Sequence, residues 1–109
     1  MKKYLSYSFD DSDVAAMVFS LNVFPTLNIA ENDAEAAMLL TQCTSAIQKL
    51  LNHETRFSAS ELNIISVALD AAQLINQGIL NVDSKVRSEC SSYLFEINKL
   101  APMFSDFLS

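Results

Sequence analysis

The chain has 109 residues, of which 50% are hydrophobic and 18% are charged, and its formal net charge is −6. This length predicts one domain spanning residues 1–109, and the acidic balance argues against direct nucleic-acid binding, which requires a basic surface. One Gly and two Pro are too few for the frequent turns of an all-β fold.

The first predicted helix begins at residues 11–13 and ends before Pro25, because the residue that precedes a proline avoids the helical region. Acidic side chains at its start are favoured by the positive end of the helix dipole. Apolar residues cover two of its faces, and the second face includes Phe19 and Val23. We expect a helix that is apolar on most sides to be buried on most sides.

The second predicted helix covers residues 31–52. Its apolar stripe repeats at alternating spacings of three and four residues and consists of Ala37, Leu40, Thr44, Ile47 and Leu51. This spacing is typical of the packed face of an amphipathic helix. Lys49 and His53 lie at the C-terminal end of the helix, where positive charge is favoured.

The third predicted helix covers residues 58–77 and has the clearest start signal in the chain. Ser58 and Glu61 have the spacing of a capping box, in which each side chain binds a free backbone amide of the first turn. Gly78 follows the end of the helix, where a residue in the left-handed backbone region commonly terminates it.

The fourth predicted helix covers residues 84–100, with Asp83 as its cap and Pro102 just beyond its end. The residues that follow can form one amphipathic turn. Because the connections are short, the long helices should pack as antiparallel neighbours. The sequence therefore predicts an all-α fold, a compact antiparallel bundle of four main helices with a short C-terminal helical turn.

The charge is unevenly distributed along the chain. Residues 4–48 contain six acidic residues and no Lys, Arg or His. The acids form two clusters at predicted helix starts: Asp10, Asp11 and Asp13 in the first, and Glu31, Asp33 and Glu35 in the second. Helix dipoles account for acids at these places, but they do not account for the missing bases. We therefore predict that both clusters bind a basic surface on a partner protein.

No residue pattern indicates catalysis, a metal or a cofactor. A calcium-binding EF-hand loop counted from Asp11 would need Gly at its sixth position and Glu at its twelfth, where this chain has Ala16 and Asn22. The chain has one His, and Cys43 and Cys90 lie far apart among apolar residues. We expect a non-enzymatic protein with two free thiols in a reducing cytoplasm.

The high apolar content of so small a domain predicts that part of its surface is covered by another molecule. We expect a homodimer that uses apolar side chains of the first helix or the C-terminal turn, namely Phe19, Val23, Met103, Phe104, Phe107 and Leu108. The alternative is that the C-terminal residues cover the open end of the bundle. The longest apolar stretch, residues 14–24, is too short to cross a bilayer, which takes about 20 residues. No membrane association is therefore predicted.

The function predicted from these features is binding of another protein, as an acidic inhibitor or adaptor. Phage proteins that inhibit nucleic-acid-handling defence enzymes, and immunity proteins that neutralise toxins, share this small, acidic, non-catalytic profile, which is an analogy of class only. Two alternatives remain open. The chain could be a structural or regulatory homo-oligomer whose acids serve only helix ends and solubility, or a helical bundle that binds a small ligand in its interior.

Overall fold

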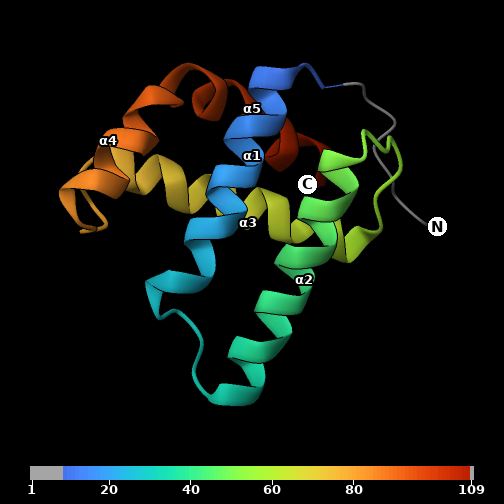
Figure 1. Cartoon of the computed structure of the whole chain (residues 1–109), viewed down its shortest axis with the longest axis horizontal. Helices are drawn as coiled ribbons and strands as arrows, with labels where there is room; N and C mark the ends of the chain where they lie inside the picture. The colour runs from blue at the N-terminus through green and yellow to red at the C-terminus, as the bar shows by residue number, and fades with distance from the viewer. Residues whose placement is uncertain (1–8, 109) are drawn as a thin grey trace.

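Helices make up most of the chain that the structure describes. The computed structural model describes residues 9–108. In chain order the elements are α1 (Asp11–Val23), the 3-10 helix η1 (Phe24–Leu27), α2 (Asp33–Leu51), α3 (Ala59–Asn76), α4 (Ser84–Ser92) and α5 (Leu94–Leu108). This arrangement confirms the predicted all-α helical bundle (Figure 1).

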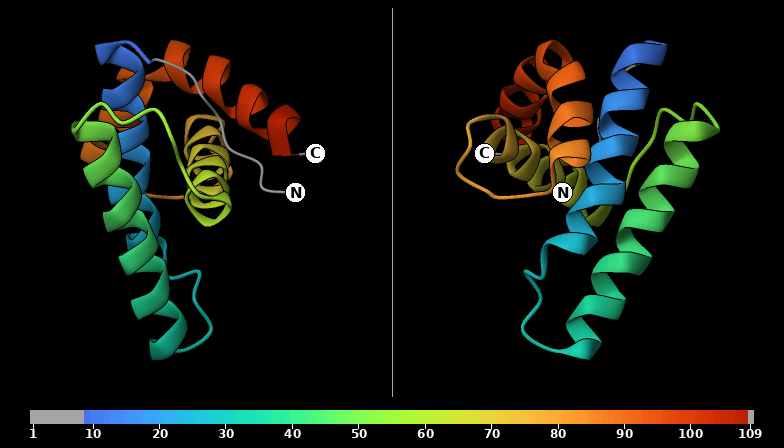
Figure 2. Two further views of the ribbon diagram at one scale, coloured as in Figure 1. Left: turned by 90° about the vertical axis from the view of Figure 1, so that its right-hand side faces the viewer. Right: turned by 60° about the vertical axis from the view of Figure 1, so that its left-hand side comes forward.

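The central helix of the bundle is α3. The helices α1 and α2 run side by side in opposite directions, and α3 lies across both of them (Figure 1). Seen from two other directions, α5 lies beside α3 and also reaches α1 (Figure 2). Because α3 contacts every other helix, ten of its 18 residues are buried, and the side chains of all five helices meet in one hydrophobic core.

Asp10 and Asn32 cap the starts of α1 and α2. Asp10 accepts a hydrogen bond from the backbone amide of Asp13 at 2.8 Å, and Asn32 accepts one from the amide of Glu35 at 2.8 Å. Each bond satisfies an amide that has no partner within its own helix. Part of the acidic first cluster therefore has a local structural role.

The predicted boundaries of α3 are confirmed. Ser58 accepts a hydrogen bond from the Glu61 amide at 3.1 Å, and the Glu61 carboxylate accepts one from the Ser58 amide at 2.7 Å, which completes the capping box. Beyond the C-terminal end, Gly78 takes a φ of 78°, in the left-handed region that favours glycine.

The predicted extent of the fourth helix, residues 84–100, is wrong. The fourth helix, α4, ends at Ser92, and Tyr93 leaves the helical conformation. The hydroxyl of Ser92 donates to the carbonyl oxygen of Glu89 at 2.6 Å and so competes with the helical backbone. The next helix, α5, runs through the exposed Pro102 to Leu108. Burial of Phe104 fixes this last part of α5 against the core and offsets the cost of the proline.

Replacing Pro102 with Ala should stabilise the protein. Proline cannot donate a hydrogen bond to the carbonyl group of Asn98, four residues earlier, and its ring crowds that group. Restoring the bond should raise the free energy of unfolding by about 1–3 kcal/mol, measured by urea denaturation. The control is Pro25→Ala, since Pro25 lies in the first turn of η1, where a missing amide costs little. A gain at Pro102 no larger than the change at Pro25 would contradict this account.

Candidate functional site

An apolar face of α2 is exposed to solvent. This face, here called the outer row, consists of Ala37, Leu40, Thr44, Ile47 and Leu51. Leu40 is 56% exposed and Leu51 is 59% exposed, and only Ile47 packs partly against the core. The interpretation of this row as the packed face of the helix is wrong, because a second apolar row, containing Cys43, Ala46 and Leu50, is buried instead.

The outer row lies on an open side of the molecule. In both views of Figure 2, α2 forms an outer edge of the described chain, and no other helix covers its far side. A shallow groove runs along this face and is lined by Leu40, Thr41, Thr44, Ser45 and Gln48. Short side chains in the middle of the groove leave room for a side chain of another molecule.

The second acid cluster lies at the tip of the α1–α2 pair. This hairpin tip, residues 28–33, connects η1 to α2, and Asn28 turns the chain there with a φ of 55°. Glu31 and Asp33 are exposed. Glu35 is half-buried, and its Oε2 atom accepts a hydrogen bond from the Glu31 amide at 3.3 Å. Two acids of this cluster are therefore available to a partner, and the third supports the tip.

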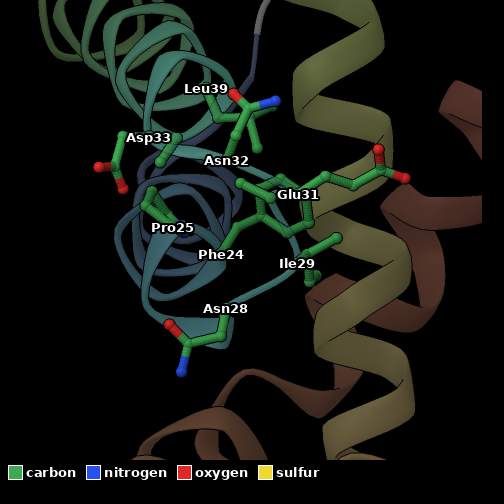
Figure 3. A pocket seen from close by; sticks show the side chains of 10 residues that line it. Phe24, Pro25, Asn28, Ile29, Glu31, Asn32, Asp33 and Leu39 are labelled. Atoms are coloured by element: carbon green, nitrogen blue, oxygen red, sulfur yellow. The ribbon is translucent and has the colours of Figure 1, made fainter.

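A hollow beside the hairpin tip combines apolar and acidic groups. Phe24, Pro25 and Leu39 form its apolar floor, and Glu31 and Asp33 are among the residues that line it. Figure 3 shows the two carboxylates on opposite sides of this floor and directed away from each other. Such a site suits a side chain with an aliphatic stem and a positively charged end, which is the structure of Lys and Arg.

The first acid cluster lies at the opposite end of α1 from the hairpin tip (Figure 1). Asp10 is an exposed cap, and hydrogen bonds from the Asp13 amide and the Ser12 hydroxyl lower its pKa. Asp11 is exposed, whereas Asp13 is only 2% exposed. The prediction that Asp13 contributes to a partner-binding surface is therefore corrected, and the two clusters do not form one continuous face.

Asp13 pairs with Lys99 of α5. Its Oδ1 atom lies 2.7 Å from Nζ of Lys99, the distance of a charge-assisted contact. The same Nζ lies 5.9 Å from the centre of the Phe95 ring. A buried carboxylate needs such a partner because removal from water destabilises its charge. This pair joins the start of α1 to α5.

A second polar contact joins α2 to α3. The carboxylate of the buried Glu61 lies 2.8 Å from Nζ of Lys49 and accepts a hydrogen bond from the Ser45 hydroxyl at 2.9 Å. Burial alone would raise the pKa of Glu61, but hydrogen bonds from Lys49, the Ser58 amide and Ser45 outweigh it and lower that pKa. Every acceptor and donor here is satisfied within the fold, so we assign this group a structural role.

Three further sequence predictions concern free thiols, metal binding and membrane association. Cys43 and Cys90 are free and buried, and burial raises the pKa of each thiol to about 11, which keeps both protonated and unreactive at neutral pH. Within residues 9–108, no group of three or more His, Cys, Asp or Glu side chains is placed to hold a metal ion. Across the same residues, no helix has the length and hydropathy needed to cross a membrane.

The residues predicted for a homodimer contact pack mainly within the protein. Phe104 is fully buried, and its ring stacks on that of Phe9 with centroids 5.9 Å apart, so it cannot contact a second copy. Phe19 packs against Tyr93, with ring centroids 5.3 Å apart. The others, Val23, Met103, Phe107 and Leu108, are partly buried against the core. Three exposed large apolar side chains, Met38, Leu40 and Leu51, lie on α2, and others, such as Phe95 of α5, lie elsewhere.

Comparison with known protein families, curated proteins and solved structures finds no match to this chain. The functional interpretation therefore rests on the hairpin tip and the outer row.

Replacing Glu61 with Gln should destabilise the protein more at neutral pH than in acid. The pKa of folded Glu61 lies below its ordinary value of 4.5, so its ionised form stabilises the fold above that value and loses this effect as the pH falls through the lowered pKa. We expect the free energy of unfolding to fall by about 1–3 kcal/mol at pH 7 and by less near pH 3. Urea denaturation measures both losses, with Glu54→Gln as the exposed control. Equal losses at the two pH values would contradict the role of the charge.

Replacing Lys99 with Met should leave the buried Asp13 carboxylate without its cation. Because Lys99 is itself partly exposed, we expect a loss of about 1–3 kcal/mol in the free energy of unfolding, less than for a fully buried pair. Adding Asp13→Asn should recover part of this loss, since a neutral amide is less costly to bury than a charge. Denaturation of both single variants and the double variant tests this coupling, and strictly additive losses would rule it out.

Proposed function

We propose that this chain is a small, non-catalytic protein that binds another protein through its hairpin tip, as an inhibitor or adaptor. The hollow at the tip carries the proposal. Its apolar floor, formed by Phe24, Pro25 and Leu39, has the exposed carboxylates of Glu31 and Asp33 on either side. A Lys or Arg side chain of a partner would place its stem on the floor and its charge beside one of the carboxylates at the rim.

The surroundings of the hollow support a basic partner. No Lys, Arg or His occurs between residues 4 and 48, so no basic side chain of α1 or of the first half of α2 competes for the two carboxylates. The hairpin tip lies at one end of the molecule, where α1 and α2 extend past α3 (Figure 1). An acidic tip in this position can reach a recessed basic surface, and its charge would increase the rate of association.

The two buried cysteines support a cytoplasmic setting for this activity. Neither Cys43 nor Cys90 forms a disulfide, and free thiols persist in reducing compartments. The proposed activity also fits the class of small acidic inhibitors and immunity-type proteins. This analogy concerns size, charge and lack of catalysis.

Reversing the charge of the tip should abolish capture of the partner. The variant Glu31→Lys/Asp33→Lys places two cations where the proposed contact needs anions, and like charges at an interface cost several kcal/mol. Affinity capture from cells that make the protein, followed by mass spectrometry, measures which bound proteins are lost. The matched control is Glu54→Lys/Glu89→Lys, which changes the net charge equally at two exposed acids elsewhere.

Circular dichroism of both double variants checks that the fold is retained. Equal capture by the tip variant and the wild-type protein would exclude the hairpin tip as the binding surface. Equal loss in the tip variant and the control would show that net charge, rather than this site, governs binding.

A further inference from the structure

We infer that the outer row of α2 binds a second copy of this chain, with the two α2 helices packed antiparallel about a two-fold axis near Thr44. This proposal concerns the solvent-facing side of α2 rather than the hollow at the hairpin tip, although Asp33 borders both, and it goes beyond the proposed function. It rests on the exposure of the row, its shape and the distribution of charge along α2.

The spacing of the outer row matches the contact face of paired helices. Its residues alternate at intervals of three and four, as the a and d positions of a coiled coil do. In a single copy this face is left largely uncovered, with Leu40 and Leu51 each more than half exposed. Covering it removes apolar side chains from water, which favours association.

The row is complementary to itself when it is reversed. An antiparallel pair centred on Thr44 places the small Ala37 opposite Leu51 of the second copy. It places Leu40 and Ile47 opposite Gln48 and Thr41, which line the groove beside the row. Thr44 then lies opposite its own symmetry mate. Large side chains therefore meet small or flexible ones, and the groove lined by Leu40, Thr44 and Gln48 receives a side chain from the facing helix. Such a surface contacts an identical surface, as a two-fold interface requires.

The charges along α2 also favour an antiparallel second copy. The exposed acid of α2, Asp33, lies at its N-terminal end in line with the outer row. His53 and Arg56 lie just beyond its C-terminal end, whereas Lys49 in its last turn pairs with Glu61 of α3. Reversing one helix brings the acidic end of each copy to the basic end of the other and pairs the helix dipoles favourably. A parallel pair would bring acid against acid.

The length of the row sets the strength of this contact. Nineteen residues of α2 correspond to about 28 Å of helix. One pair of helices of this length buries an area near the lower end of the range for specific interfaces, about 1,200 Å². We therefore expect a dimer that dissociates in the micromolar range rather than an obligate one.

Analytical ultracentrifugation over a range of concentrations tests the dimer. The wild-type protein should show a reversible monomer–dimer equilibrium, and Leu40→Asp should raise its dissociation constant about tenfold or more, because it places a charge in an apolar contact. The matched control is Ile79→Asp, since Ile79 is 64% exposed in the connection between α3 and α4, away from the row. Its dissociation constant should stay near that of the wild-type protein. A wild-type protein that remains monomeric at about 100 μM would overturn the proposal, as would equal effects of the two variants.

Disulfide trapping tests the position of the two-fold axis. Paired helices lie about 8–10 Å apart, which brings the backbones at their contact close enough for a disulfide. Under mild oxidation Thr44→Cys should therefore form a covalent dimer much faster than Asn63→Cys, an exposed position on α3. The native Cys43 and Cys90 are buried, so wild-type protein sets a low background. Equal rates for the two variants would overturn the proposed packing.

The outcomes separate this proposal from the function proposed for the hairpin tip. Leu40→Asp leaves the hollow and its two carboxylates in place. A monomeric protein that still captures a partner through Glu31 and Asp33 would overturn the dimer alone. A dimer that captures no partner would overturn only the proposed function.

Discussion

The contacts of Glu61 hold α2 in one rotation about its own axis. Glu61 lies in the first turn of α3 and contacts Ser45 and Lys49, which are one helical turn apart on α2. With those two positions held against α3, Cys43 faces the core and Leu40 faces solvent. Both proposed binding surfaces therefore depend on the buried Glu61 carboxylate, which belongs to neither surface. Its hydrogen bonds specify how α2 packs against α3.

The two proposed surfaces use different parts of the same helix pair. The hollow at the hairpin tip opens between η1 and the first turns of α2, whereas the outer row runs along the face of α2 that points away from the other helices. An antiparallel α2 pair would place two hairpin tips at opposite ends of the dimer. A dimer of this kind would bind two sites at once, and linkage of two weak contacts increases the overall affinity.

The acidic first half of the chain has more than one role in the structure. Asp10 caps α1, Asp13 forms a buried ion pair with Lys99, and Glu35 supports the hairpin tip, whereas Glu31 and Asp33 are exposed beside an apolar hollow. The absence of basic residues in this half therefore bears on the hairpin tip in particular. Asp13 shows why charge counted along a sequence overstates an acidic surface, since its partner lies 86 positions away in the chain, from 13 to 99.

The sequence by itself determined the fold class and most helix boundaries. The capping box of Ser58 and Glu61 and the left-handed Gly78 involve groups only a few residues apart, so their geometry depends little on the rest of the chain. Only the tertiary structure decided which apolar row of α2 is covered, because Leu40 and Cys43 belong to rows of similar hydropathy. Contact with α3 selects between those rows. Burial of Phe104 likewise stabilises α5 beyond Pro102, where local rules predict that a helix ends.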